Sequence, residues 1–463
     1  MRAFSHTDAE GIQASVMKQI NQINLLTLIR EHAPTSRAVL ARLSRLSKPT
    51  VSAQVEALLA TGLVIETGQG QSGERGGKKP TQLEFNADYG CIVVAEIGPA
   101  EIRLALTDLN GTIRATSSLS TEARLGAGRV VAKLEQGIRD LLSQPSQPGQ
   151  APNLCLIAVG APGRVDVERG VVLDAGNVFD WENIPIAEPL NRVFRTSVLV
   201  DNIVNLAALG EMTYGAAQGV SDFIFVQHGT GIGCGVVLGG KIHHGSNWAA
   251  GEIAHLTLNL QEAGKDWTPR GYLEMQVGAD RVAERVRAAQ RRDPALNRLQ
   301  DGGSEIGSLL RAAKEGNAIA REIVADLVLH LGTAIAHIAA TYDPSLVVLQ
   351  GEIFPPLLGE LESIAKKAVP WLPRLAVSEL GEGAALRGAI VAARSKAHER
   401  IVQQLSEMDA QRQGKRELPG PERGKLFRSN PAAGLWTKPE PVFSGAKNTA
   451  DPSGIGPVKR GRT

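Results

Sequence analysis

The first 66 residues carry apolar side chains at the spacing of a helix. They recur three and four positions apart, which is the period of one helical face: Val16, Ile20, Ile23 and Leu26. This pattern predicts a first helix that ends near Arg30, because Pro34 cannot continue it.

Two shorter helices follow in the pattern. Thr35 or Ser36 can cap a second helix, in which Val39, Leu40 and Leu43 point inward. Ser47 caps a third helix with Pro49 in its first turn, where a missing N–H costs little. The buried stripe of this third helix is predicted from its apolar positions: Val51, Val55, Leu58 and Leu59.

The opposite face of the third helix is polar and can meet phosphates and base edges, as the recognition helix of a helix-turn-helix does. After Gly62, the runs Leu63–Ile65 and Leu83–Phe85 predict a hairpin, whose tip over residues 73–80 is glycine-rich and basic and suits the minor groove. The candidate DNA contacts are Arg37, Ser47, Lys48, Thr50, Ser52, Gln54, Arg75, Lys78 and Lys79. The alternative is a three-helix module that binds protein and carries a solvated charged loop.

Residues 88–398 alternate strand-like runs with helical stretches, which predicts an α/β architecture. The runs are Cys91–Ile97, Ile102–Leu106, Leu154–Val159, Val198–Val200, Phe223–Val226 and Leu346–Leu349. Residues 399–463 are rich in Pro, Gly, Lys and Arg toward their end, and we expect a disordered basic tail. The predicted organisation is therefore a winged helix-turn-helix over residues 1–87, an α/β domain over 88–398 and the tail.

Composition narrows the class of protein. Of the 463 residues, 43% are hydrophobic and 21% are charged, as in a soluble globular chain. The three cysteines have no CxxC spacing, which favours buried thiols in a reducing compartment. The N-terminus has no apolar signal stretch, and no run approaches 18 apolar residues, so we expect a cytoplasmic protein without a membrane span.

A glycine-rich run over residues 228–235, after the strand Phe223–Val226, can approach an anion through its backbone N–H groups, although it can also be a tight turn. It continues into Gly251-Glu252-Ile253-Ala254-His255. Together these residues resemble the ROK family of repressors, open reading frames and sugar kinases. Further matches are Gly160-Ala161-Pro162-Gly163, the run from Asn205 to Glu211, Pro344 through Gly351, and Lys48-Pro49-Thr50-Val51-Ser52 in the head. The resemblance covers roughly residues 15–398 and implies a two-lobed actin-like ATPase fold.

The sequence departs from the kinases of that family where phosphoryl transfer needs a general base. By resemblance, the base is the Asp of an Asn-Asp-x-Asn segment, and that position holds Ile203 here. Losing a general base typically costs about 10²–10⁴-fold in rate. Asp201 is two residues away, and we doubt that it substitutes. The first phosphate loop of the family is replaced by the run from Glu96 to Glu101, in which Pro99 removes an N–H donor. We therefore predict no catalytic residue and no enzyme activity.

The resemblance also implies a structural zinc site that this chain lacks. The cysteine positions hold Lys265, Trp267 and Tyr272, so His255 alone remains, and one neutral histidine is no tetrahedral site. We predict no metal and no cofactor. Packing of Trp267 against Tyr272 is the hypothesis for what braces this region instead.

The positions that contact the sugar in the family are kept. The resemblance implies five sugar-binding residues: Asn177, Asn202, Glu252, His255 and Glu274. The alternative for two of them is that His255 and Glu252 form a buried structural couple.

These expectations describe a transcriptional regulator, most simply a repressor of carbohydrate genes. The predicted partners are double-stranded DNA with an inverted-repeat operator, a monosaccharide effector and a second copy of the chain in a homodimer or homotetramer. Three alternatives stay open: an active sugar kinase with a DNA-binding head, a DNA-binding protein controlled by a protein partner, and a regulator without a ligand.

Overall fold

The computed structural model describes residues 6–70, 79–121, 126–144, 153–176, 181–292 and 304–414, with side chains except at 6–16, 292 and 406–414. The described residues up to 411 form one compact unit. Three of the predicted site residues, Arg75, Lys78 and Asn177, lie outside the described residues.

The N-terminal head consists of three helices followed by an antiparallel hairpin, as the sequence predicts. Its elements are α1 (His6–Glu31), α2 (Arg37–Ser44), α3 (Lys48–Thr61), β1 (Val64–Gln69) and β2 (Thr81–Phe85). The predicted buried stripe of α3 is confirmed at Val51, Val55 and Leu58. Leu43, predicted to point inward, is 41% exposed, and Ile20 on the apolar face of α1 is 52% exposed.

The first lobe is built on a five-stranded sheet in the order β10-β6-β3-β4-β5. Its strands are β3 (Cys91–Ile97), β4 (Glu101–Asp108), β5 (Ile113–Ser120), β6 (Leu154–Ala161) and β10 (Ser197–Asn202). A smaller three-stranded sheet contains β7 (Arg164–Asp166), β8 (Val171–Asp174) and β9 (Glu182–Pro185). A short helix, η1 (Ala87–Tyr89), leads into β3.

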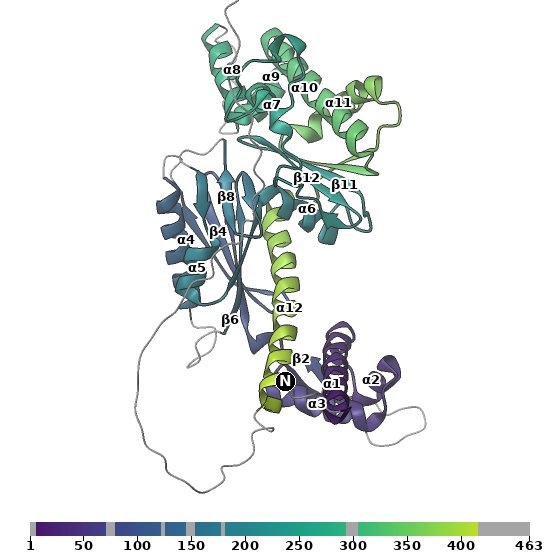
Figure 1. Ribbon diagram of the computed structural model, residues 1–463. Helices are drawn as coiled ribbons and strands as arrows, with labels where there is room; N and C mark the ends of the chain where they lie inside the picture. Colours follow the sequence, from purple (N-terminus) through teal and green to yellow (C-terminus); the bar gives the residue numbers. More distant parts are fainter. Residues whose placement is uncertain are drawn as a thin grey trace, which may run out of the picture. The chain divides into compact units, whose positions relative to one another are not determined.

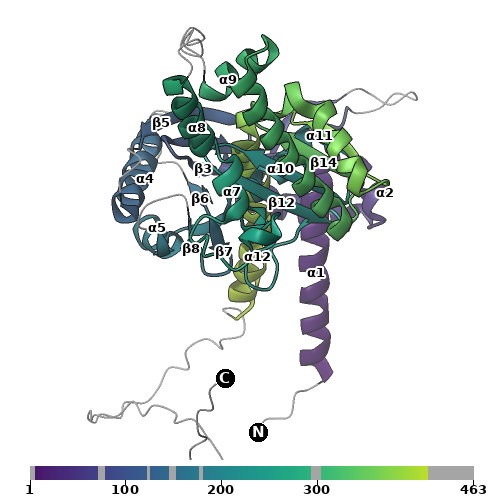
Figure 2. The same ribbon diagram turned by 90° about the horizontal axis from the view of Figure 1, so that it is seen from above.

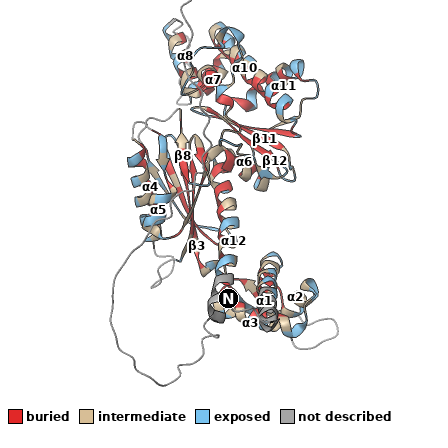
Figure 3. Ribbon diagram, viewed as in Figure 1, coloured by how far each residue is buried: buried red, intermediate tan, exposed pale blue. Residues whose placement is uncertain are grey.

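Alternate residues of β3 face two different helix layers. Val93 and Ala95 pack in one cluster with α4 (Ala127–Leu142) and α5 (Ala187–Phe194), which Figures 1 and 2 show on the same side of the sheet. Ile92 and Val94 pack in another cluster with residues of α12 (Ala384–Gly414). The sheet is therefore buried on both faces, and Figure 3 shows its central strands as buried.

The second lobe contains a five-stranded sheet in the order β13-β12-β11-β14-β15. Its strands are β11 (Phe223–His228), β12 (Ile232–Leu238), β13 (Lys241–Ile242), β14 (Leu346–Gln350) and β15 (Arg374–Val377). The remaining helices are α6 (Ile203–Tyr214), η2 (Ile253–His255), η3 (Leu260–Glu262), α7 (Tyr272–Val277), α8 (Ala279–Arg292), α9 (Glu305–Lys314), α10 (Ala318–Tyr342), α11 (Phe354–Ala368) and η5 (Gly381–Gly383).

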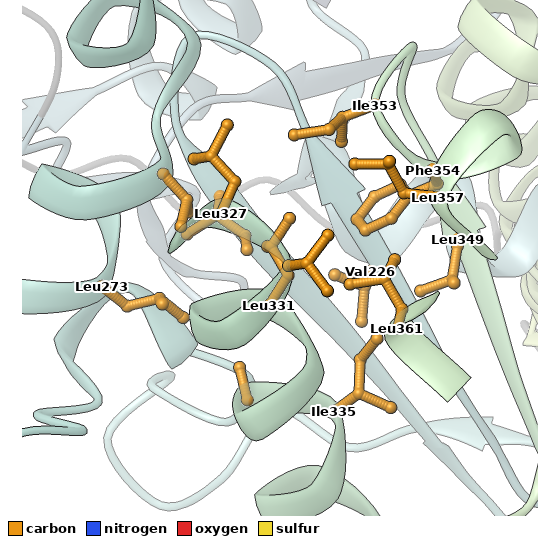
Figure 4. Close-up of a cluster of buried hydrophobic side chains, with 14 of the residues drawn as sticks. Val226, Leu273, Leu327, Leu331, Ile335, Leu349, Ile353, Phe354, Leu357 and Leu361 are labelled. Atoms are coloured by element: carbon orange, nitrogen blue, oxygen red, sulfur yellow. The ribbon is translucent and has the colours of Figure 1, made fainter. Parts of the chain in front are cut away.

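The main core of this lobe lies between the sheet and helices α10 and α11. Figure 4 shows Leu331 and Ile335 of α10 beside Val226 of the sheet and Leu361 of α11. Helix α10 is the one described helix that is long and apolar enough to cross a membrane, and 61% of its apolar window is buried inside the protein. Its apolar character is explained by this core position.

Helix α12 corrects the predicted start of the tail. It runs from Ala384 to Gly414, so residues 399–414 are helical and not part of a disordered segment. The polar composition concealed this helix, but residues 399–413 contain no proline or glycine, and most of them favour helices. Ile401 and Leu405 are buried on its apolar stripe.

Candidate functional site

The boundaries of α2 and α3 are set by two serine caps. The Ser36 hydroxyl accepts a hydrogen bond from the Val39 N–H at 3.4 Å, and the Ser47 hydroxyl accepts one from the Thr50 N–H at 3.3 Å. Such caps satisfy N–H groups that have no partner within the helix. Gly62 ends α3 with a φ of 80°, a conformation that favours glycine. Both caps are therefore confirmed, with Ser36 rather than Thr35 capping α2.

The polar face predicted for α3 is present except at one position. Lys48 is exposed, and Thr50 and Ser52 are half-buried. Gln54 is wrongly assigned to this face, because it is only 6% exposed and its Oε1 atom is buried without a partner. It lies one helical turn from Val51 and Leu58 and thus belongs to the buried stripe.

Arg37, a predicted DNA contact, forms ion pairs within the head. Its guanidinium pairs with Glu56 of α3 at 2.6 Å and with Glu66 of β1 at 3.1 Å. These contacts tie α2 to α3 and to the hairpin, so the guanidinium is already engaged in this conformation. Lys79, at the base of the hairpin, is exposed.

Two arginines that the sequence analysis did not select are available on the same head. Arg42 lies in the last turn of α2, and Arg45 follows it with a φ of 57° in the turn before α3. Both side chains are exposed and form no ion pair with the described residues. A cluster of basic residues at a helix-to-helix turn was the signal that could have identified them.

A small pocket lies where the start of α6 meets β12 and the loop after β13. Its lining residues are Asn202, Val204, Asn205, Gly233, Cys234, Trp248, Ala250 and Glu252, and its volume is about 30 Å³. A cavity of this size has room for about two water molecules. A monosaccharide is larger, so the pocket must widen before it can hold one.

Asn202 is the N-cap of α6 and shapes this pocket. Its Oδ1 accepts hydrogen bonds from the N–H groups of Val204 at 2.6 Å and Asn205 at 3.4 Å. Its Nδ2 donates to the carbonyl of Gly163 at 2.6 Å. The side chain therefore connects α6 to the turn between β6 and β7.

Glu252 presents a carboxyl group with no hydrogen-bond partner among the described residues. Its pKa is raised to about 7, chiefly by burial and also by the neighbouring charges of Asp174 and Glu274, while Arg164 acts in the opposite direction. This side chain can accept hydrogen bonds from a ligand, and it changes its charge near neutral pH.

The other predicted sugar contacts do not line the pocket. Glu274 is 6% exposed, and its two oxygens accept hydrogen bonds from the Arg270 Nε at 2.7 Å and the Ile232 N–H at 3.3 Å. His255 is exposed at the end of η2, so it does not form a buried couple with Glu252. The structure thus brings together Asn202 and Glu252 and leaves Glu274 and His255 outside the pocket lining.

Two further side-chain pairs hold the walls of the pocket. The Arg164 guanidinium binds Asp174 and donates to the carbonyl of Asn247 at 3.3 Å, so it reaches the loop that contains Trp248. His244, on the same loop, bonds through Nε2 to Asp201 at 2.9 Å. This bond raises the pKa of His244.

Asp201 is fully engaged by its neighbours. In addition to its bond with His244, its Oδ1 accepts hydrogen bonds from the Asn202 N–H at 2.7 Å and from the Asn205 Nδ2 at 3.1 Å. Ile203 begins α6 and lies beside Gly160, where an added Cβ would be 3.5 Å from the Ile203 side chain. Each oxygen of the Asp201 carboxylate therefore already accepts at least one hydrogen bond, and the position after Asn202 is an isoleucine that cannot take a proton.

The β3–β4 turn carries a buried ion pair. Glu96 is 6% exposed and accepts a hydrogen bond from Arg103 at 2.6 Å, and the same guanidinium donates to the carbonyl of Glu382 at 2.9 Å. Burial raises the pKa of Glu96, and Arg103 opposes that shift. The turn is closed by the Gly98 N–H bonding to the Glu101 carbonyl.

Comparison with known proteins identifies the family of this chain. The sequence profile described as "ROK family" matches residues 91–396, about two thirds of the chain. The chain belongs to the ROK family.

Relatives in this family include regulators and kinases. The chain is 29% identical to a putative xylose repressor of a Caldicellulosiruptor species over 76% of this chain and 89% of the relative. It is 26% identical to the DNA-binding transcriptional dual regulator NagC of Escherichia coli over 73% and 82%. It is 30% identical to a glucokinase of Halalkalibacterium halodurans, but over 56% of this chain and 80% of the relative.

A solved structure supports the fold. The crystal structure of a ROK family transcriptional regulator, a homologue of the E. coli MLC protein, superposes with a TM-score of 0.66 at 21% identity and covers 85% of this chain and 98% of that chain. The predicted actin-like ROK fold is therefore confirmed for the α/β part.

The residues at the zinc positions of the ROK family do not fit a metal ion. The described part of the chain contains no group of three or more His, Cys, Asp or Glu side chains that could hold one. Instead, the Trp267 and Tyr272 rings meet edge to face at 5.3 Å, and the Tyr272 hydroxyl lies 3.1 Å from the His330 Nε2. This geometry agrees with the hypothesis that aromatic packing braces the region.

Proposed function

We propose that this ROK protein is a DNA-binding transcriptional regulator whose kinase-like region binds a sugar without phosphorylating it. The observation that carries the proposal is that the pocket has a hydrogen-bond acceptor for a sugar but lacks a general base for phosphoryl transfer. Glu252 offers a free carboxyl group in the pocket, whereas Ile203 cannot take a proton and Asp201 is tied to His244 and Asn205.

The head would bind DNA as a winged helix-turn-helix. In this proposal α3 lies in the major groove, with Lys48, Thr50 and Ser52 toward the bases, and the hairpin with Arg75, Lys78 and Lys79 reaches the minor groove. Arg42 and Arg45 would contact phosphates. A cytoplasmic homodimer would place two heads on an inverted repeat.

The relatives support a carbohydrate signal. The xylose repressor and NagC are named as regulators, and their matches are longer than the match to the glucokinase. A pentose or hexose is therefore the proposed effector, and repression of carbohydrate genes is the proposed outcome.

A continuous path of packed residues would connect the pocket to the head. Asn202 caps α6, and α6 crosses α12 at Gly210 and Gly388, where the backbones meet directly. Farther along α12, Ala393 and Ile401 belong to the same hydrophobic cluster as Leu25 of α1. Movement of α6 on sugar binding would thus reach α12 and then the head, a coupling that is typically worth about 1–3 kcal/mol.

The proposed phosphate contacts predict a change in salt dependence. A double variant with Arg42→Gln and Arg45→Gln is expected to weaken DNA binding and to reduce the slope of log K against log salt by about 2, because each contact releases about 0.9 counterion. Fluorescence anisotropy across a salt series measures this slope. Lys366→Gln, on α11, is the matched control, and an unchanged slope in the double variant would exclude these contacts.

The sugar-binding half of the proposal is tested by a thermal-shift screen of the full chain against pentoses, hexoses and their phosphates. A binding sugar is expected to raise the melting temperature by about 3 °C at about 100 times its Kd. An ADP-release assay with each hit and ATP distinguishes a sensor from a kinase. The proposal predicts binding without turnover; turnover at an ordinary enzymatic rate of about 1 s⁻¹ or more would instead establish a kinase.

A further inference from the structure

Three basic side chains lie near one another where residues of α1 and α12 share one hydrophobic cluster. Arg30 is in the last turn of α1, with its guanidinium 5.8 Å from the centre of the Phe85 ring. Arg394 and His398 are four residues apart on α12 and therefore share one face of that helix. Ile29 and Phe85 of the head and Ala397 of α12 all belong to one hydrophobic cluster, and Ile29 and Ala397 are the chain neighbours of Arg30 and His398.

These groups have no carboxylate partner in the part of the chain that the structure describes. The Arg394 Nη1 makes one long hydrogen bond, at 3.4 Å to the carbonyl of Asn110, and the His398 Nδ1 is buried without any partner. All three side chains are half-buried. Partly buried charges are normally paired, so this arrangement is incomplete as it stands.

The charges oppose one another. Burial lowers the pKa of Arg30, and the positive charge of Arg394 lowers it further. Burial also lowers the pKa of His398, and Arg30 adds to that shift. The carboxylates that act in the opposite direction, Glu31 on Arg30 and Glu399 on His398, have the smallest effects. An anion between these groups would remove the repulsion.

We infer that Arg30, Arg394 and His398 form a binding site for a phosphate group, separate from the sugar pocket. Two guanidinium groups and an imidazole N–H supply donors from several directions, which suits the oxygens of a tetrahedral phosphate. One donor comes from the head and two come from α12. A bound phosphate therefore holds the head against α12 and gives the protein a second small-molecule input.

The phosphate group can come from inorganic phosphate or from a phosphorylated sugar. Both supply the same charge and the same acceptor oxygens. Comparing inorganic phosphate with glucose 6-phosphate distinguishes the two sources: similar affinities mean that the phosphate group alone is recognised, and an affinity at least about 10-fold higher for the ester means that the sugar adds contacts. Either result supports the site, provided that the binding depends on Arg394.

The test is a thermal-shift and calorimetric titration of the full-length protein with potassium phosphate, against potassium chloride at equal ionic strength. The wild type is expected to gain about 3 °C at about 100 times the Kd. Arg394→Gln and His398→Gln are expected to lose most of this gain. Lys396→Gln is the matched control on the same helix, because Lys396 is exposed and its one ion pair among the described residues is with Glu399.

Two results would overturn the inference. The first is equal stabilisation of the wild type by phosphate and chloride. The second is a phosphate response that survives in both Arg394→Gln and His398→Gln. The variant Glu252→Gln separates this site from the sugar pocket, and we expect it to keep the phosphate response. If Glu252→Gln loses the phosphate response while Arg394→Gln keeps it, the phosphate binds in the sugar pocket instead. The inference therefore stands or fails independently of sugar sensing.

Discussion

Replacing Glu252 with glutamine is expected to weaken sugar binding by about 10- to 100-fold, because a ligand hydroxyl loses a charged acceptor that is worth roughly 1.5–3 kcal/mol. Glu252 is the one pocket carboxyl in the described chain without a hydrogen-bond partner, so its acceptor capacity is free for a ligand. Calorimetry with a sugar from the thermal-shift screen measures the change. Glu360→Gln, at an exposed position of α11, is the control. Equal affinity of the Glu252 variant and the wild type would remove this residue from the site.

The same variant also has a distinctive pH dependence. The pKa of Glu252 is raised to about 7 in the folded protein, so the folded state holds its proton where the unfolded state has already released it. The contribution of this proton to the free energy of unfolding is fully present below the pKa of Glu252 in the unfolded chain. It is lost as pH rises through about 7. The wild type should therefore lose up to about 3 kcal/mol relative to Glu252→Gln between pH 5 and pH 8. Urea unfolding at several pH values checks this, and parallel pH profiles for the two proteins would contradict the assigned environment.

Replacing Gly388 with alanine is expected to cost about 3 kcal/mol or more of unfolding free energy. A Cβ at this position would overlap the Leu206 carbonyl oxygen and lie 2.9 Å from the Gly210 nitrogen. These are backbone atoms that cannot rotate away, so α6 and α12 must separate. Gly210 faces the same restriction, because a Cβ added there would overlap the Ala384 carbonyl oxygen.

A matched glycine distinguishes this crossing from a general helix effect. Gly359 lies inside α11, and a Cβ added to it would have no atom within 4 Å, so Gly359→Ala should stabilise the protein by about 0.5–1 kcal/mol through helix propensity. Urea denaturation of both variants gives the comparison. If Gly388→Ala is as stable as Gly359→Ala, the close crossing of α6 and α12 is wrong, and so is the proposed path from pocket to head.

Much of the fold could be predicted from the sequence because its signals are local. Serine caps, Pro49 and runs of β-branched residues define helices and strands through neighbouring residues alone, and these predictions are confirmed. The wrong predictions arose where the polarity of a residue does not match its burial or its secondary structure. Gln54 is polar but occupies the buried stripe of α3, and the polar end of α12 concealed a helix that continues to Gly414.

The pocket was harder to predict because its geometry depends on contacts between distant residues. Asn202 and Glu252 were selected by resemblance and both line the pocket, but Glu274 is held by Arg270 and Ile232. The bond between Asp201 and His244 joins residues 43 positions apart, so no local sequence pattern predicts it. The free arginines of the head were missed for another reason: helical periodicity ranks apolar positions and does not show which cations lack a partner.

Fluorescence anisotropy of labelled upstream DNA, titrated with the full-length protein in the presence and absence of a pocket-binding sugar, tests the central claim most directly. The account predicts that the sugar changes DNA affinity by about 5–150-fold, that the change does not require ATP and that Glu252→Gln shifts it to higher sugar concentrations. Identical DNA affinity at saturating sugar would contradict the proposal that occupancy of this pocket is the signal.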